Sequence, residues 1–527
     1  MRLRHAHLAV AGALFCASAP TPAGPGPQAT KPTLLVFITV DQMRGDYLDR
    51  WASQYTSGLK RLAQGGAFFT DGHQDHAITE TAPGHASTMS GRFPRSTGIA
   101  RNLAGVNDPN SPVIGSNALG ASPFRFRGTT LTDWLAKADP RSNALSVSFK
   151  DRGAILPIGR SKQDVYWWGG RDFTTSTWYR DTLPGWVQAF NARQIPASNA
   201  GKAWDLLLPE ASYPEPDSVP IESSGRGFLF PHRLSASADT ATAQYPGFPW
   251  MDDLTADFAL AGVNALELGK GPETDVLAVS FSATDLIGHR YGPDSRELHD
   301  QLLRLDRVIG AFIDSLYKLR DSTRIIFALT GDHGVSSFPE LNNGRITPAP
   351  MRVDLRPAIQ AAQQALLAGG GDPNVIELES GSLVINPDSA KAGPAVIRAA
   401  ADSFVAVAKR IPGVLRADRF ADLAKADLGK DKIARRWVQM FAPDVPVVAV
   451  VTPTPGSYWW YMGGIAQHGT PTEQETFVPI LFYGPPFKPG RYSGYTRTVD
   501  MAPTLARVLG VTPGEPLDGH VLTAAIK

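Results

Sequence analysis

The sequence predicts an α/β fold in which helices flank a mostly parallel central sheet and two inserted segments cap the core. Several runs are continuously apolar and rich in β-branched residues, which is typical of strands buried on both faces. These runs alternate with amphipathic helical segments, as parallel strands require. Two stretches, at about 160–245 and 345–440, interrupt the alternation and are expected to be the caps.

Length and composition describe a large protein with an ordinary core. The 527 residues are 43% hydrophobic and 19% charged, and the formal net charge is +1. This balance gives no sign of a nucleic-acid surface or a basic membrane arm. The single cysteine is Cys16. Because it lies in the N-terminal segment, we expect no disulfide and no thiolate chemistry in the rest of the chain.

Residues 1–23 have the pattern of a secretory signal peptide. Arg2 and Arg4 give a basic start, an apolar run from Leu8 to Ala17 follows, and small residues come after it. This run is too short to span a bilayer. We therefore expect residues 24–527 to form one exported domain without stable membrane insertion, periplasmic if the source is a Gram-negative bacterium.

The first half of the chain contains three predicted strands. The first, at 33–40, is continuously apolar and ends at Asp41. Ligands of open α/β sheets gather at the carboxyl ends of strands, so Asp41 is placed for chemistry. Helical patterning at 44–65 precedes a short strand at 67–70. After a helix at 131–137, a strand at 144–149 ends in Lys150-Asp151-Arg152.

The stretch at about 160–245 is rich in Trp, Tyr, Pro and Ser and has no long helical pattern, so we interpret it as a cap. After a helix at 251–268, a strand at 275–281 leads to Asp285 and His289. A long helix at 295–320 precedes a strand at 324–330, which ends just before Asp332 and His333.

The second insertion, at about 345–440, has mostly helical patterning. A strand at 447–451 follows it, and His468 comes after an aromatic loop. A further strand at 478–483 and a closing helix at 501–509 complete the predicted elements.

The stretch 78–91 places Thr81 two positions before Pro83-Gly84, with small residues behind. Because Pro fits the first positions of a helix, Thr81 is expected at a helix N-terminus, where free N–H groups favour an anion. A hydroxyl there suits attack on phosphorus or sulfur. The alternative is that Thr81 only caps the helix.

Three Asp and three His residues follow predicted strands or stand in loops. Such mixed ligands suit Zn²⁺, which takes three or four protein ligands per ion. Six of them and one hydroxyl are enough for two ions, and two metals can hold both oxygens of an in-line phosphoryl displacement. They are Asp41, Asp285, His289, Asp332, His333 and His468.

This combination resembles the alkaline phosphatase superfamily, and within it the bacterial Thr-nucleophile (PafA-like) group. That group is related to the nucleotide pyrophosphatase/phosphodiesterases, whose nucleophile loop reads T-x-P-x-H, as Thr81 to His85 do here. The resemblance runs from Val40 to His468. It implies an alkaline-phosphatase-like three-layer sandwich with two Zn²⁺ per chain, acting as a monomer on small phosphate monoesters.

The resemblance also implies a role for each ligand. One zinc would be bound by Asp285, His289 and His468. The other would be bound by Asp41, Asp332 and His333, with the Thr81 oxygen as its fourth ligand. Thr81 would attack phosphorus and form a phosphothreonine intermediate.

Asn102, Lys150 and Arg152 are the residues that the resemblance places on the phosphoryl oxygens. A Lys/Arg pair favours the more highly charged monoester, because each cation meets a charged oxygen. In the resembled group this pair marks monoesterases, and its absence marks the diesterase branch. Without that context, Lys150-Asp151-Arg152 would be a solvated turn.

Other functions share parts of this pattern. A phosphodiesterase or nucleotide pyrophosphatase is the nearest alternative, and a non-catalytic metal-binding relative is another. The loop lacks both the sulfatase motif and the D-S-A nucleophile of the Ser-type phosphatases. Thr79 is the rival nucleophile, and His85 is expected to pack or bond within its helix. His73 and His76 lie near the loop without a predicted role.

Overall fold

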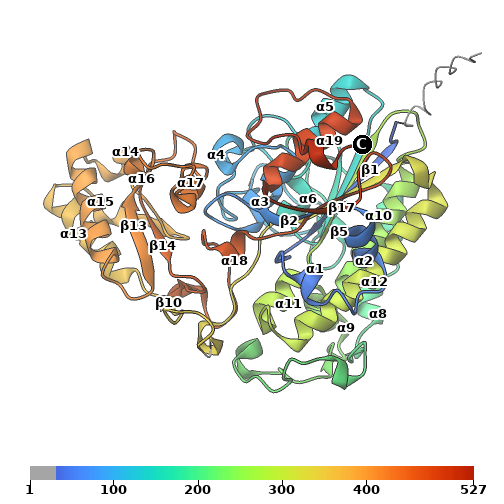
Figure 1. Cartoon of the computed structure of the whole chain (residues 1–527), viewed down its shortest axis with the longest axis horizontal. Coiled ribbons are helices and arrows are strands. Elements are labelled where there is room, and N and C mark those ends of the chain that lie inside the picture. The colour runs from blue at the N-terminus through green and yellow to red at the C-terminus, as the bar shows by residue number, and fades with distance from the viewer. Residues whose placement is uncertain (1–30, 343) are drawn as a thin grey trace, which may run out of the picture. The chain divides into compact units, whose positions relative to one another are not determined.

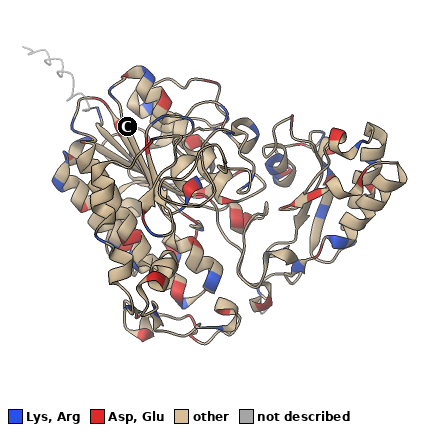
Figure 2. Ribbon diagram, turned by 180° about the vertical axis from the view of Figure 1, so that it is seen from behind, with Lys and Arg blue, Asp and Glu red and all other residues tan. Residues whose placement is uncertain are grey.

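The computed structural model describes residues 31–342 and 344–527, so the expected signal peptide at 1–23 lies outside the described residues. Residues Lys31–Lys527 form one compact unit. None of the described helices combines the length and the apolarity that crossing a bilayer needs. Figure 2 shows Lys and Arg interspersed with Asp and Glu along the ribbon, as the nearly balanced charge leads one to expect.

The core is a nine-stranded sheet with the strand order β17-β2-β16-β9-β1-β8-β3-β4-β5 (Figure 1). Strand β16 is antiparallel to β2 and β9, and β5 is antiparallel to β4, whereas the other neighbours are parallel. The strands are β1 (Leu34–Val40), β2 (Ala67–His73), β3 (Ala144–Ser148), β4 (Asp164–Trp168), β5 (Phe173–Thr174), β8 (Asp275–Phe281), β9 (Ile325–Gly331), β16 (Ile480–Tyr483) and β17 (Gly490–Arg497).

Strand β1 shows why the continuously apolar runs become central strands. All its residues are buried, and it pairs in register with β8 on one side and β9 on the other. Alternate side chains pack in two different hydrophobic cores, Val36 and Ile38 on one face of the sheet and Leu35 and Phe37 on the opposite face. The sheet is therefore the middle layer of three.

Helices cover both faces of this sheet. One core includes side chains of α2 (Gly58–Gly65), α10 (Trp250–Ala265) and α12 (Arg296–Leu319). The opposite core includes side chains of α3 (Thr81–Thr88), α5 (Leu131–Ala138), α6 (Asp151–Ile155) and α19 (Met501–Leu509). The predicted α/β class with a mostly parallel central sheet is confirmed.

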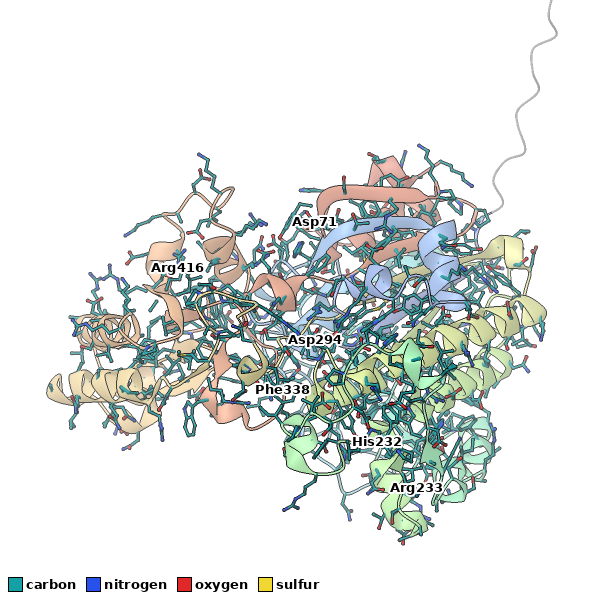
Figure 3. The ribbon with its side chains drawn as sticks, turned by 60° about the horizontal axis from the view of Figure 1, so that its bottom comes forward. Asp71, His232, Arg233, Asp294, Phe338 and Arg416 are labelled. Carbon is teal, nitrogen blue, oxygen red and sulfur yellow. The ribbon has the colours of Figure 1, made fainter. Side chains whose placement is uncertain are left out.

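The first insertion begins later than predicted. Strands β4 and β5 lie inside the range 160–245, yet they complete one edge of the central sheet. The aromatic composition suggested a cap, but Tyr166 and Trp168 pack in one core while Val165 and Trp167 pack in the other. The rest of the segment consists of short elements, among them β6 (Ala203–Trp204) and β7 (His232–Arg233), whose two residues are labelled in Figure 3.

The second insertion contains long helices, as the patterning predicted, but it also contains a sheet that the patterning did not predict. A four-stranded sheet in the order β11-β12-β14-β13 packs with α13 (Arg356–Ala368) and α15 (Pro394–Ala408) around a separate core. The predicted strand at 447–451 is β14 (Val447–Pro453), and it joins this sheet rather than the central one. It pairs with β12 (Ser382–Val384) and β13 (Val414–Arg419), and β12 pairs in turn with β11 (Glu377–Glu379).

Four neighbouring strands, β9, β1, β8 and β3, are parallel, so their carboxyl ends meet at one edge of the sheet. Asp41 and Asp332 directly follow β1 and β9. Lys150 follows β3, and Asp285 lies in α11 (Ala283–Tyr291), just after β8. This topology gathers residues from four distant segments at one place.

Candidate active site

Thr81 is the first residue of α3, as predicted, and only 1% of its surface is exposed. All residues of this helix are buried. Gly84 allows the helix to pack against the end of β9, because a Cβ at this position would lie 2.1 Å from the carbonyl oxygen of Asp332. The Thr81 hydroxyl therefore sits at a helix start beside the carboxylates that follow the strands.

The three predicted histidine ligands are oriented in the same way. In each ring Nδ1 bonds to a backbone carbonyl, which leaves Nε2 for the interior of the site. The bonds run from His289 to Ala466 (2.6 Å), from His333 to Gly334 (2.9 Å) and from His468 to Thr79 (2.7 Å).

The first predicted ligand set lies close together. His289 Nε2 is 3.3 Å from Asp285 Oδ1 and 3.2 Å from His468 Nε2, and His468 Nε2 is 3.7 Å from Asp285 Oδ1. Atoms so spaced can all lie about 2 Å from one common centre, which is the bond length of zinc to nitrogen and oxygen.

The second predicted set surrounds His333. Its Nε2 is 3.5 Å from Asp41 Oδ1 and 3.6 Å from Asp332 Oδ2. The His333 ring also stacks on that of His468, with centroids 3.6 Å apart, so it lies between the two sets. Grouped by closeness alone, candidate ligand atoms form the sets Asp285–His333–His468 and Asp41–His85–Asp332, so His333 joins the first set and His85 takes its place in the second.

His85 differs from its prediction. Its Nε2 lies 3.5 Å from Asp332 Oδ2 and 3.5 Å from the Ser280 hydroxyl, so the ring faces the strand ends rather than bonding within α3. Burial lowers the pKa of His85 to about 3. A neutral imidazole beside Asp332 is consistent with a place next to the second set.

Unpaired buried atoms show that this donor set fits metal ions. Within the described residues, Asp41 Oδ1, Asp332 Oδ2 and His333 Nε2 are buried and make no hydrogen bond. Burial and the neighbouring Asp41 raise the pKa of Asp332 well above its ordinary value, and burial lowers the pKa of His333 to about 4. Divalent cations would compensate buried carboxylates and neutral imidazoles of this kind.

Lys150 lies at the centre of the cluster. Its amine is 2.7 Å from Asp41 Oδ2, 2.6 Å from Asp285 Oδ2 and 3.5 Å from the Thr81 hydroxyl. Burial disfavours the ammonium, but Asp285 and Asp41 outweigh it and raise the pKa of Lys150. Burial also works against the charged form of Asp285, yet Lys150 and His289 hold the pKa of that carboxyl well below its usual range.

Asn102 is held at the start of α3. Its side-chain oxygen accepts the N–H of Ala82 (2.9 Å), and its own backbone N–H donates to Glu80 Oε2 (2.7 Å). Because the oxygen faces the helix, the amide nitrogen is the donor left for a ligand. Arg152 is partly exposed and pairs with Asp151 at 3.6 Å.

A family model described as type I phosphodiesterase / nucleotide pyrophosphatase matches residues 35–469. The chain belongs to this family. Alkaline phosphatase PhoV of Synechococcus elongatus is 30% identical over 94% of this chain and 93% of its own length. Alkaline phosphatase PafA of Elizabethkingia meningoseptica is 28% identical over 94% of this chain and 95% of its own length.

Solved structures agree with this membership. The crystal structure of PafA covers 95% of this chain and 100% of its own, with 27% identity and a TM-score of 0.85. Murine ectonucleotide pyrophosphatase/phosphodiesterase 5 covers 92% of this chain at 14% identity and a TM-score of 0.51, which supports the fold alone. The predicted resemblance and the alkaline-phosphatase-like fold are confirmed.

Three residues of this family member contact the site and were not predicted. Gln42 has a positive φ of 64°, donates its backbone N–H to Asp332 Oδ1 (3.0 Å) and donates its amide to Asp285 Oδ1 (2.8 Å). Glu80 holds Asn102, and Glu475 bonds to Thr79 (3.2 Å). Gln42 could have been found because it follows Asp41 directly, whereas Glu80 and Glu475 are isolated acidic residues that carry no signal in the sequence.

Thr79 is not placed as a nucleophile. Its hydroxyl accepts the N–H groups of Gly469 and Thr470, both at 3.1 Å, and lies 3.0 Å from the carbonyl oxygen of Thr470. These contacts occupy the hydroxyl and tie the residue to the loop after His468. The hydroxyl of Thr81 has only Lys150 among its hydrogen-bond partners in the described part of the chain.

A cavity of about 590 Å³ lies away from these residues. Among the described residues that line it are Asp71, His73, Asp294 and Phe338, three of which are labelled in Figure 3. His73 bonds to Asp71 at 2.9 Å there, whereas His76 is buried and its ring nitrogens make no hydrogen bond to the described residues. We place the active site by its converging polar groups rather than by cavity volume.

Proposed function

We propose that this protein is a two-metal alkaline phosphatase that hydrolyses phosphate monoesters through a phosphothreonine at Thr81. The observation that carries the proposal is the Thr81 hydroxyl at the start of a buried helix, 3.5 Å from the Lys150 ammonium and beside the carboxylate–imidazole cluster. Relatives over nearly the full length that are named alkaline phosphatases support the reaction class.

Two zinc ions suit the ligands. Asp285, His289 and His468 would hold one ion, and Asp41, Asp332 and His333 would hold the other beside Thr81. Such ions, when bound, supply Lewis acidity at the attacking and leaving oxygens. The oxygen and nitrogen donors and their closeness support zinc, since thiolates and octahedral oxygen cages are absent from the described site.

The residues of the chain itself supply the other parts of the reaction. The Thr81 oxygen bonds to phosphorus while the bond from phosphorus to the leaving oxygen breaks, and the hydroxyl proton passes to solvent. The nearby Lys150 ammonium stabilises the deprotonated Thr81. Water then cleaves the phosphothreonine, which releases phosphate and restores the hydroxyl. The N-terminus of α3 and the Asn102 amide stabilise the phosphoryl oxygens throughout.

Preference for monoesters follows from the cations. A monoester dianion presents one more charged oxygen than a diester, and two cations follow β3: Lys150, which lies 3.5 Å from the Thr81 hydroxyl, and Arg152. The second candidate function is a phosphodiesterase, which the description of the family model favours. Ectonucleotide pyrophosphatase/phosphodiesterase family member 7 of mouse matches 12% of this chain, so it supports this candidate over a short segment.

The test is the ratio of kcat/KM for an aryl phosphate monoester to that for the matching diester, measured on the zinc-loaded protein. We expect a strong monoester preference that collapses in the Lys150→Ala/Arg152→Ala double variant. Arg152→Ala alone removes one cation and leaves the ion pairs of Lys150 with Asp41 and Asp285 intact. It therefore tests the effect of a cation without disturbing those pairs. A wild-type preference for the diester would move the protein to the phosphodiesterase branch.

We further propose that the protein acts as an exported, periplasmic monomer on small phosphate monoesters. The signal-like pattern of residues 1–23 supports export. The N-terminal sequence of protein recovered from the periplasm tests it, together with the mass of the native protein in solution. An uncleaved N-terminus in a cytoplasmic fraction would contradict export.

A further inference from the structure

One buried carboxylate joins three segments of the predicted site, those that carry Thr81, His333 and His468. Glu475 lies in α18 (Glu473–Thr476), and none of its surface is exposed. Its Oε2 accepts the backbone N–H of Thr470 (2.7 Å) and lies 3.2 Å from the Thr79 hydroxyl, and its Oε1 accepts the Ser336 hydroxyl (2.7 Å).

Each of these three partners is a near neighbour of a predicted functional residue. Thr79 precedes Thr81 by two positions, Ser336 follows His333 by three, and Thr470 follows His468 by two. The segments belong to distant parts of the chain, since Thr79 and Glu475 are 396 residues apart in sequence. A single side chain thus connects the nucleophile loop to the loops of two metal ligands.

Backbone bonds run between the same segments. The N–H of Gly334 donates to the carbonyl oxygen of Glu475 (2.7 Å), and the N–H of Ser336 donates to that of Gln467 (2.9 Å). His468 Nδ1 bonds to the carbonyl oxygen of Thr79 (2.7 Å), and this contact sets the orientation of its ring. The position of Thr79 therefore determines the orientation of the predicted ligand His468, and Glu475 helps to hold Thr79 in place.

We propose that Glu475 is a positioning residue that holds the nucleophile loop, His333 and His468 in register for metal binding. The proposal rests on the proposed two-metal site, and Glu475 acts through Thr79, Ser336 and Thr470 without touching the reacting atoms. Removing residues that support the metal ligands through hydrogen bonds typically weakens metal affinity by about 10–100-fold. Without this acceptor the buried Thr470 N–H keeps only its longer bond to the Thr79 hydroxyl (3.1 Å), and the Ser336 hydroxyl loses its bond to Glu475, so we expect the loop that carries His468 to move.

Two substitutions at Glu475 separate hydrogen bonding from simple filling of space. Glu475→Met keeps an unbranched side chain of similar length but removes both acceptors. Glu475→Gln keeps an oxygen for the Thr470 N–H and offers its amide to the Ser336 hydroxyl, which can turn to accept it. We therefore expect Gln to rescue most of what Met loses.

A second pair of variants tests the same connection from the other side. Thr79→Val removes the hydroxyl that accepts the N–H groups of Gly469 and Thr470, whereas Thr79→Ser keeps it. The matched control is Asp306→Leu. Asp306 is also a buried carboxylate that accepts backbone N–H groups, but its partners are at the start of α2: Thr56, Ser57, Leu59 and Lys60.

The main readout is Zn²⁺ affinity, measured by competition with a chelator and without substrate. Glu475→Met and Thr79→Val should weaken affinity by about 10–100-fold, while Glu475→Gln, Thr79→Ser and Asp306→Leu stay near wild type. At saturating Zn²⁺, kcat for an aryl phosphate should fall more in Glu475→Met than in Asp306→Leu. If Glu475→Met fails to fold, Thr79→Val carries the test alone.

Unchanged Zn²⁺ affinity in Glu475→Met, or an equal loss in Asp306→Leu, would overturn the positioning role. A wild-type protein that binds Zn²⁺ tightly but hydrolyses no monoester would refute the proposed function only, since the affinities would still decide the role of Glu475. A wild-type protein that binds no Zn²⁺ would refute both.

Discussion

Replacing Asn102 by Ala and by Asp should separate the two halves of its amide. The oxygen accepts the Ala82 N–H at 2.9 Å, and the nitrogen is the half left for a phosphoryl oxygen. Asn102→Ala removes both groups. Asn102→Asp keeps an acceptor for Ala82 but places a second oxygen where the donor was. Of the two variants, Asn102→Asp should therefore be the more stable protein but the less active enzyme.

The magnitudes follow from these contacts. Losing the Ala82 bond in Asn102→Ala costs about 1 kcal/mol of folding stability, and losing a donor to the transition state costs about 10²–10³-fold in kcat. In Asn102→Asp the new carboxylate faces a charged phosphoryl oxygen. At about 4 Å and an effective dielectric of about 20, this repulsion is about 4 kcal/mol, or about another 10³-fold. Asn102→Asp should thus be the slower enzyme and the more stable protein.

The assay is kcat/KM for an aryl phosphate monoester at saturating Zn²⁺, with the melting temperature of each variant recorded beside it. A variant series in which Asn102→Asp turns over as fast as Asn102→Ala would show that the amide nitrogen does not face the phosphoryl group. Activity near wild type in Asn102→Ala would remove Asn102 from the substrate site altogether.

Three further predictions concern the nucleophile, the metal and a buried acid. Thr81→Ala should abolish turnover while the protein keeps its zinc, measured by metal content after gel filtration; residual turnover at wild-type level would exclude Thr81 as the nucleophile. Chelation should lower the melting temperature and Zn²⁺ should restore it, because free Zn²⁺ at a hundred times its Kd stabilises the folded protein by about 2.7 kcal/mol. An unchanged melting temperature would contradict the metal site. Burial, and then Glu297, raise the pKa of Glu222 from 4.5 to about 9. Between these two pKa values the folded chain keeps a proton on Glu222 that the unfolded chain releases. The contribution of this proton to folding stability is fully present below the unfolded-state pKa and is lost as pH rises through the folded-state pKa. Glu222→Gln should therefore gain stability over wild type as pH rises from about 5 to about 9, and parallel urea-unfolding profiles would refute this.

The central strands could be predicted because their signal is local. A strand buried on both faces must be apolar at every position, and β1, β8 and β9 show this in their own residues. The convergence of Asp41, Asp285 and Asp332 then follows from parallel pairing, because the carboxyl ends of neighbouring strands share one edge. The structure brings all the predicted ligands together, while their roles stay predictions.

The failures share a different cause, which is dependence on distant partners. Strands β4 and β5 look like cap sequence until β3 supplies an edge for them to pair with. The sheet of the second insertion was missed because its strands are short and its two helices dominate the pattern. Glu80 and Glu475 are isolated acidic residues in the sequence, and part of their significance comes from partners hundreds of residues away.

The second insertion is more than a cover, because it contacts the residues that flank both Thr81 and Asn102. Ser380, next to β11, donates its hydroxyl to Glu80 Oε1 (2.7 Å), and Glu80 Oε2 in turn accepts the N–H of Asn102. Arg101 bonds to Glu379 at 2.6 Å and to Ser382 at 3.0 Å. A shift of this hairpin would therefore move Glu80 and Arg101, and with them Asn102, whose amide we propose to face the phosphoryl group. Differences in this insertion between family members should change substrate handling even where every metal ligand is the same.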